Sequence, residues 1–300
     1  MPNASIIPPP PNRTSEGEAL DAAARVRPVL EAKLPDAQIT TPATAGAVRQ
    51  MVAATSPPAT PDPRGRSFSR ATAEDFLYLA ELVEFVNAEA PDLVALTGDY
   101  VGYNKKTLKP CCDALAELEG HVLAVLGNHD HWASTQYAHE CFEGAEIPLL
   151  TNESLHLAHN GVKLQIVGVD DEVTKHADVP GAFADVDPEL FCLTLNHVPS
   201  IAWLCADAGG HLILSGHTHG FQFNIPRITN AIAERMGTKL FAGPYRLENA
   251  ILYISRGLGS SSWPRRIRAL PELTFFELQP GKRPELELVS SVEMTIAGRR

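Results

Sequence analysis

Helices alternate with short apolar strands from about Ala71 onward, and this alternation restricts the fold more than any other feature of the sequence. Residues Ala73–Ala90 have apolar side chains at helical spacing, and the apolar segment Leu93–Thr97 follows directly after Pro91. Further strands are predicted at Val122–Leu126, Lys163–Val169, Leu190–Leu195, Leu212–Leu214 and Ile251–Ser255, and further helices at Leu108–Leu118 and near Ser200–Asp207. Such a pattern predicts an α/β fold with covered sheets.

Polar residues that can bind metals follow five of these strands. They occur in the segments Gly98-Asp99, Gly127-Asn128-His129-Asp130, Gly168-Val169-Asp170-Asp171, Asn196-His197 and Gly216-His217-Thr218-His219. Open α/β sheets bind ligands beyond the carboxyl ends of their strands, and a preceding glycine lets the chain approach an ion closely. Carboxylate, amide oxygen and imidazole are ligands of Mn, Fe, Zn or Ni. The sequence therefore predicts a site for one or two divalent transition-metal ions.

Each of these residues has a chemical role open to it. Asp99 can bridge two cations, Asn128 offers an amide oxygen, and three imidazoles offer ring nitrogens, those of His197, His217 and His219. Metals held in this way activate water for attack on phosphorus. His129 could protonate the leaving oxygen or hydrogen-bond the phosphate, and Asp130 could orient its ring. Singly, each motif is weak evidence, because Gly-Asp is often a turn and Asn-His a polar loop.

The remaining histidines are predicted to serve packing or the surface. They are His121, His131, His139, His156, His159, His176 and His211.

The composition excludes several other classes of protein. The formal net charge of −11 makes a nucleic-acid partner unlikely, since such proteins present clustered Lys and Arg. No apolar run reaches the roughly 18 residues of a membrane-spanning helix, and Met1–Pro11 lacks the features of a signal peptide. The five cysteines form no CxxC pair, which favours a reducing compartment. We therefore expect a cytoplasmic protein without a transmembrane segment.

The N-terminal part differs in amino-acid composition from the rest of the chain. Twelve of the 24 prolines lie at or before Pro63, which favours extended, irregular backbone. Within it, Ser15–Leu34 could form one helix, with Ser15 as its N-cap. We predict an extension over residues 1–45, partly disordered or forming that one helix, and a catalytic-type domain over residues 46–300.

Taken together, GD, GNHD, NH and GHTH resemble the motifs of calcineurin-like metallophosphoesterases. The resemblance covers about Ala71 to Leu278, and Ser255-Arg-Gly-Leu-Gly259 and Arg268-Ala-Leu-Pro-Glu272 resemble the closing segments of a bacterial sub-branch. It implies a four-layer α/β/β/α sandwich with a two-metal site. In that site Asp99 bridges, Asn128, His197 and His217 bind one metal, and His219 binds the other. His129 is then the catalytic histidine.

The resemblance also implies a metal-dependent hydrolase of phosphomonoesters, phosphodiesters or pyrophosphates. Sub-branch members act on phosphodiester or pyrophosphate bonds, some of them in lipid-linked substrates. A phosphorylated small molecule or a lipid-linked compound is therefore the expected partner. Arg256, Arg265, Arg266 and Arg268 could meet an anionic substrate or a lipid headgroup, so peripheral membrane contact is open, although a solvated basic turn is the simpler interpretation.

One motif of the family is missing from this chain. The family opens with Asp-x-His at the end of its first strand, but this sequence contains no Asp-x-His and no histidine before His121. The best first strand is Ala47–Val52, which puts Ala53 and Thr55 at the two ligand positions, and neither residue is a good ligand. Three interpretations stay open: a phosphoesterase with reduced activity, an inactive metal- or phosphate-binding relative, and a rearranged sequence before about residue 70.

Overall fold

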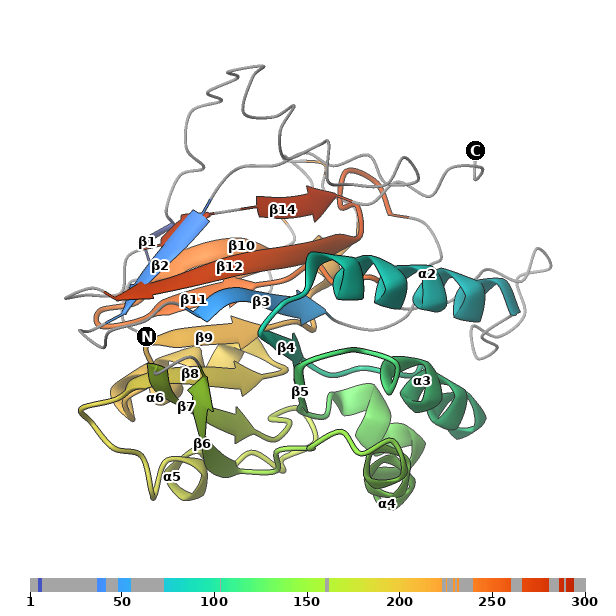
Figure 1. The fold of residues 1–300 in the computed structure, drawn as a ribbon, viewed down its shortest axis with the longest axis horizontal. Coiled ribbons are helices and arrows are strands. Elements are labelled where there is room, and N and C mark those ends of the chain that lie inside the picture. Colours follow the sequence, from blue (N-terminus) through green and yellow to red (C-terminus); the bar gives the residue numbers. More distant parts are fainter. Residues whose placement is uncertain are drawn as a thin grey trace.

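Two mixed β-sheets form the centre of the structure, a computed structural model (Figure 1). The described residues are 5–6, 37–41, 48–54, 73–102, 104–159, 162–222, 225, 229, 231, 240–259, 266–280, 286–288 and 290–293. The predicted helix Ser15–Leu34 lies outside them.

The first sheet has seven strands. In spatial order they are β1 (Ser5–Ile6), β10 (Gly243–Arg246), β11 (Ile251–Ile254), β9 (Leu212–Ser215), β8 (Phe191–Asn196), β7 (Val162–Val169) and β6 (Glu153–His159). The second sheet has the order β13 (Leu286–Leu288), β2 (Ala37–Thr41), β12 (Glu272–Pro280), β3 (Val48–Ala54), β4 (Leu93–Leu96) and β5 (His121–Ala124), with β14 (Ser290–Glu293) paired to β12.

Helices cover the outer faces of both sheets. The second sheet carries α2 (Ala73–Glu89), α3 (Leu108–Leu115) and α4 (Asn128–Gly144), and the first carries α5 (Val179–Ala182) and α6 (Ala202–Asp207). Figure 1 shows α2, α3 and α4 together on one side, with α5 and α6 beside the strands of the first sheet.

Alternation along the strands explains how the layers pack. In β4, Leu93 and Ala95 join the apolar cluster between the two sheets, whereas Val94 and Leu96 join the cluster beneath α2, α3 and α4. Successive strand side chains point to opposite faces, so a wholly apolar strand serves two cores.

The first sheet follows the same rule. Leu164 and Ile166 of β7 face the second sheet, and Val167 and Val169 pack with the residues of α5 and α6. The result is the predicted four-layer α/β/β/α sandwich.

Parallel pairing brings the predicted site residues to one side of each sheet. In the second sheet β3, β4 and β5 are parallel, with Ala54 opposite Leu96 and Leu96 opposite Ala124. In the first sheet β7, β8, β9 and β11 are parallel. The carboxyl ends of neighbouring parallel strands meet at one edge of a sheet, where ligands bind.

The N-terminal residues contribute strands to both sheets. Ser5–Ile6 pairs with β10, and Ala37–Thr41 pairs with β12 and β13. The domain boundary at residues 45 and 46 stays a prediction.

Two findings bear on the expected environment. In the part of the chain that the structure describes, no helix has the length and apolar character needed to span a bilayer. All five cysteines are buried as free thiols, and burial raises the pKa of Cys192 and of Cys205 to about 12.

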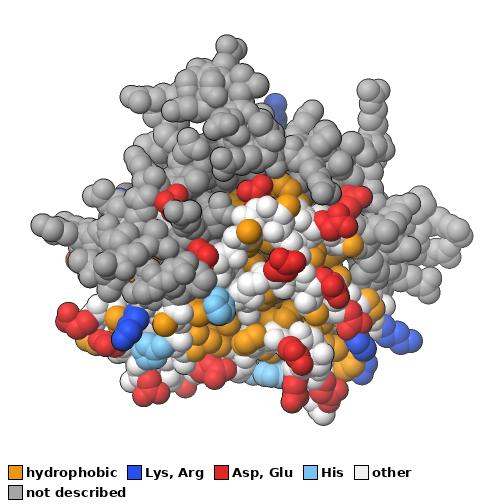
Figure 2. Space-filling view, viewed as in Figure 1, with side chains coloured by type: hydrophobic (Ala, Val, Ile, Leu, Met, Phe, Trp, Pro, Cys, Tyr) orange, Lys and Arg blue, Asp and Glu red, His pale blue; other side chains and the backbone are white. Residues whose placement is uncertain are grey.

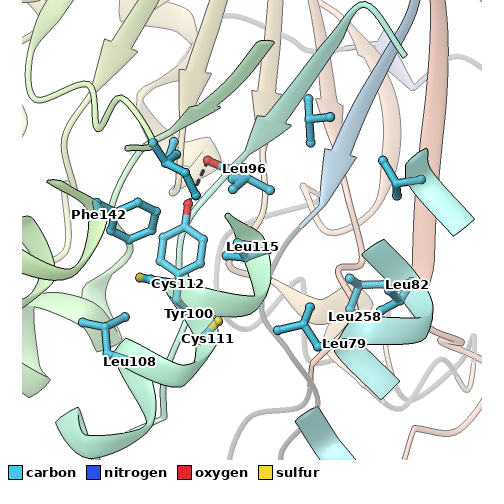
Figure 3. Close-up of a cluster of buried hydrophobic side chains, with 14 of the residues drawn as sticks. Leu79, Leu82, Leu96, Tyr100, Leu108, Cys111, Cys112, Leu115, Phe142 and Leu258 are labelled. Carbon is cyan, nitrogen blue, oxygen red and sulfur yellow. Dashed lines mark hydrogen bonds between the residues drawn. The ribbon is translucent and has the colours of Figure 1, made fainter. Parts of the chain in front are cut away.

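A buried tyrosine joins the site-bearing strands to the helical layer. The Tyr100 hydroxyl donates to the carbonyls of Leu96 at 3.1 Å and Val125 at 3.0 Å, and its ring packs on Phe142 at 4.7 Å (Figure 3). Tyr100 follows Asp99 directly, so this anchoring also fixes the start of the loop that carries Asp99.

We expect Tyr100→Phe to lower the free energy of unfolding by about 1–2 kcal/mol, because two buried carbonyls lose a donor while the packing volume stays nearly the same. Urea unfolding of wild type and variant measures this. Tyr137→Phe, at a half-buried position on α4, is the matched control, with a change expected within about 0.5 kcal/mol. Equal stability of wild type and Tyr100→Phe would contradict the anchoring role.

Candidate metal centre

Two glycines allow the loops after β4 and β5 to approach closely. Gly98 has φ +92°, and a Cβ on it would lie 2.6 Å from the backbone nitrogen of Gly127 and 2.7 Å from Nδ1 of His197. A Cβ on Gly127 would lie 2.3 Å from Oδ1 of Asp99. Any side chain at either position would displace the loops, which is why a glycine precedes both Asp99 and Asn128.

The carboxylate of Asp130 ties these two loops together. Its Oδ2 accepts the backbone N–H groups of Asp99 (2.8 Å) and Gly127 (2.9 Å), and its Oδ1 accepts those of Tyr100 (2.8 Å) and Val101 (3.3 Å). Asp130 is fully buried. Burial and the nearby charge of Asp99 raise its pKa, while the backbone N–H groups act in the opposite direction. Its contacts hold the metal-site loops in place.

His197 offers one defined ring nitrogen to the site. Its Nδ1 lies 2.7 Å from the carbonyl oxygen of Thr97, which can only accept, so Nδ1 carries a proton and donates. Its Nε2 lies 3.2 Å from Oδ2 of Asp99. A histidine held by a carbonyl in this way has the tautomer of a typical metal ligand.

His217 and Asn128 complete the group. Nδ1 of His217 lies 2.9 Å from Oδ1 of Asn128 and 3.2 Å from Nε2 of His197. The ligand atoms of Asp99, His197 and His217 all lie within 4.8 Å of one another. Two oxygens and two imidazole nitrogens therefore converge, a donor set that suits a transition-metal ion.

The electrostatics of this group follow from its burial. Burial acts to raise the pKa of Asp99, but the charge and hydrogen bond of His197 outweigh it and lower that pKa. Burial acts to lower the pKa of His197, and Asp99 outweighs it and raises that pKa. Burial and the charge of His197 lower the pKa of His217 to about 4. In the metal-free site, a proton between Nε2 of His197 and Asp99 would occupy the place of a cation, so we expect metal binding to release it.

His129 borders the group from the first turn of α4. Its backbone N–H donates to Oδ1 of Asp99 at 2.9 Å, and its Nδ1 lies 2.8 Å from the carbonyl oxygen of Gly102, to which it donates. The indole of Trp132, 54% exposed, meets the His129 ring edge-on at 5.0 Å. The orienting contact of the His129 ring is therefore the Gly102 carbonyl, whereas the carboxylate of Asp130 accepts backbone N–H groups.

His219, the fifth predicted ligand, lies beside the group but contacts an arginine. Its Nδ1 is 3.3 Å from Nη2 of Arg266. Burial and the charge of Arg266 lower the pKa of His219 to about 3. The group of metal-binding atoms found among the described residues contains Asp99, His197 and His217 but not His219.

The first strand would supply the remaining ligands of a second metal ion, and here the sequence departs from the family. β3, close to the first strand predicted at Ala47–Val52, pairs with β4, with Ala53 opposite Ala95, and Thr55 lies outside the described residues. Alanine supplies no donor atom. Among the described residues, the donors fit one metal ion, and β3 supplies no ligand for the family's second.

Some residues at the site were not predicted from sequence. His131, expected to serve packing or the surface, is buried with its Nε2 2.7 Å from Oδ1 of Asp170, and it stacks on His176 at 4.2 Å. The carboxylates after β7 were recognisable from the strand-end pattern, but their histidine partner was not. Oδ1 of the fully buried Asp171 has no hydrogen-bond partner among the described residues, and its charge raises the pKa of His197.

The structure combines a four-layer α/β/β/α sandwich with metal-binding side chains at the carboxyl ends of its strands. This combination of fold and site indicates a metal-dependent protein of the α/β class. The family model for calcineurin-like phosphoesterases matches residues 72–221. This chain belongs to the calcineurin-like phosphoesterase family, as the motifs in the sequence predicted.

Three relatives illustrate the family. The chain is 30% identical over 223 residues to the uncharacterized metallophosphoesterase YkuE of Bacillus subtilis (strain 168), covering 71% of this chain and 77% of YkuE. It is 30% identical over 197 residues to the phosphodiesterase YaeI of Escherichia coli (strain K12), covering 63% and 71%. It is 26% identical over 253 residues to the UDP-2,3-diacylglucosamine pyrophosphatase LpxG of Chlamydia trachomatis serovar D, covering 65% and 76%.

Replacing Asp130 tests whether its carboxylate positions the metal ligands. Asp130→Asn places an NH₂ group against backbone N–H donors, so the loops of Asp99 and Asn128 should shift and metal affinity should fall about 10–100-fold. Isothermal titration with Mn²⁺ measures this. Asp113→Asn, which alters an exposed carboxylate on α3, is the control. The role fails if both variants bind Mn²⁺ as tightly as wild type.

The shared proton predicts a pH dependence of metal binding. Asp99 raises the pKa of His197, so Nε2 of His197 is protonated as the pH falls, and a metal ion must displace that proton. While one proton is displaced per ion, the apparent affinity for the metal should weaken by about tenfold for each pH unit. Titrations with Zn²⁺ in buffers of different ionisation enthalpy measure both the affinity and the protons released. An affinity that stays constant between about pH 6 and pH 8, with no proton release, would exclude this coupling.

Proposed function

We propose that this chain is a metal-dependent hydrolase of phosphoester or pyrophosphate bonds, working at one well-formed metal position. The observation that carries the proposal is the convergence of Asp99, Asn128, His197 and His217, with the ring tautomer of His197 set by the Thr97 carbonyl and the two loops already held together. When bound there, a divalent cation polarises a phosphoryl oxygen and lowers the pKa of water.

The chain's own residues then have distinct tasks. Asp130 and the two glycines hold the Asp99 and Asn128 loops at the site. His129 donates from Nδ1 to the Gly102 carbonyl; in its imidazolium form, in which Nε2 is also protonated, it can hydrogen-bond the phosphate or give the Nε2 proton to the leaving oxygen. In this proposal His129 is the catalytic residue, and Asp130 is a positioning residue that acts through the loops.

The relatives and the surface support an organic phosphate as substrate. YaeI is named a phosphodiesterase and LpxG a UDP-2,3-diacylglucosamine pyrophosphatase. The exposed Trp132 beside His129 supplies an apolar surface on which an organic leaving group could rest. Asp and Glu side chains are spread over the described part of the face in Figure 2, which gives little support to a polyanionic nucleic-acid substrate.

The ion and the compartment are also proposals. The mixed oxygen and nitrogen donors suit Mn, Fe, Zn or Ni, and we propose Mn as the first ion to test. Five buried free thiols support a reducing, cytoplasmic location. The exposed, adjacent Ile267 and Arg268 support peripheral contact with an anionic lipid surface.

An inactive metal- or phosphate-binding relative is the second candidate. The observation in its favour is the second metal position, where β3 brings alanine instead of a carboxylate. Losing one stabilising cation costs at least what losing one oxyanion donor costs, about 10²–10³ in rate, so reduced activity is part of the first proposal.

Hydrolysis of a chromogenic phosphodiester with added Mn²⁺ separates the two candidates. We expect Asp99→Ala and His217→Ala each to lower kcat/KM by about 10²–10³ or more. His139→Ala, on the exposed side of α4, is the matched control and should keep the wild-type rate. Activity that survives both site substitutions would refute this assignment, and wild type without activity would favour the inactive candidate.

A further inference from the structure

The imidazole of His219 faces the guanidinium of the half-buried Arg266. Nη2 of Arg266 lies 3.3 Å from Nδ1 of His219, and Nη1 of the same arginine donates to the carbonyl oxygen of His219 at 3.4 Å. The charges of Asp99, His197 and His217 also act on this ring, so it borders the metal centre.

This contact defines the tautomer of the ring. A guanidinium has N–H donors and no acceptor, and the two N–H groups of Nη2 are shared among the carbonyls of Gly259 and Arg256 and Nδ1 of His219. A proton on Nδ1 would therefore face donors only, so Nδ1 is on the acceptor side of this contact. In a neutral imidazole with Nδ1 accepting, the proton is on Nε2. Nε2 then carries the only proton of the ring, so a cation could bind Nε2 only if the ring became an imidazolate. His197 shows the opposite arrangement: the Thr97 carbonyl keeps a proton on Nδ1, so Nε2 can bind a cation while the ring stays a neutral imidazole.

Arg266 is fixed in this position by other contacts. Its guanidinium also donates to the carbonyl oxygens of Gly259 (2.7 Å from Nε), Ala269 (3.1 Å) and Arg256 (2.9 Å). Arg256 is in turn paired with Glu272, whose other carboxylate oxygen accepts from Tyr253 at 2.6 Å. Arg266 cannot turn away to expose Nδ1 without leaving these carbonyls unsatisfied.

The loop that carries His219 depends on the same segment. His217, His219, Phe221 and Gln222 all have positive φ, between 51° and 66°, which is costly for residues other than glycine. The backbone N–H of Ile267 donates to the carbonyl of Gln222 at 2.7 Å. The chain that follows β11 therefore holds this loop in its strained conformation, together with the ring orientation of His219.

We propose that His219 is not a metal ligand in this chain but a hydrogen-bond donor, which offers Nε2–H to a phosphoryl oxygen beside a single bound metal ion. Two observations support this proposal: among the described residues β3 places alanine, and no carboxylate, at Ala53, and the ring of His219 is held with Nδ1 against Arg266. The part that concerns the phosphoryl group rests on the proposed function, while the ion count and the tautomer do not.

Metal content separates this proposal from a two-metal site. Wild type equilibrated with Zn²⁺ and desalted should hold one ion per chain by elemental analysis. His219→Ala and His219→Gln should keep that ion, and His217→Ala, two residues away in the same loop, should lose it. Two ions in wild type, with one lost in the His219 variants, would overturn the proposal. No ion in wild type would contradict both the proposal and the metal centre.

The tautomer and the phosphate contact are tested on the Zn²⁺-loaded protein without an activity assay. Nitrogen-15 NMR of the histidine rings of wild type should show His219 protonated at Nε2, and a metal-bound Nε2 would overturn the proposal. Inorganic phosphate should bind His219→Ala about tenfold more weakly than wild type, or weaker still. Unchanged phosphate affinity would overturn the donor role. A protein that binds one ion and phosphate but hydrolyses nothing would contradict the proposed function and leave this inference standing.

Discussion

The metal centre depends on one buried carboxylate that belongs to no ligand set. Asp130 accepts backbone N–H groups from the loop after β4 and from the loop after β5, and so fixes the distance between Asp99 and Asn128. The two loops come so close that only glycine fits at Gly98 and Gly127. Without that carboxylate the facing N–H groups would be buried and unpaired, which is costly enough to reopen the loops. The metal donors are thus positioned by hydrogen bonds within the loops, before any cation binds.

The fold could be predicted largely from strand patterns, because wholly apolar strands such as Leu93–Leu96 must be covered on both faces. The helix Asn128–Gly144 was not predicted: its sequence is mostly polar and its backbone departs from helical angles at Ser134, so it lacks a clear 3.6-residue period. β12 was missed as well: it begins directly after Pro271 and ends at Pro280, and the recognisable motif Arg268–Glu272 stops at its first residue. Sequence periodicity reports burial, and it fails where an element is held mainly by polar contacts.

The site residues were predicted by their position at strand ends, and the structure brings four of them together. Sequence could not predict which groups would face the individual ring nitrogens, because these contacts come from distant segments. Gly102 holds His129, Thr97 holds His197, and Arg266, 47 residues further along the chain, holds His219. His131 shows the same limitation, since only the folded chain reveals its partner Asp170. The chemistry of a histidine depends on these partners as much as on its place in a motif.

The central claim is that Asp99, Asn128, His197 and His217 together hold a metal ion. The most direct measurement is anomalous X-ray diffraction at the Zn absorption edge from crystals grown with Zn²⁺. The account predicts one strong anomalous peak, about 2.0–2.2 Å from Nε2 of His197, Nδ1 of His217 and an oxygen of Asp99. Crystals of zinc-treated protein with no peak among these side chains, or with the ion bound elsewhere, would contradict it.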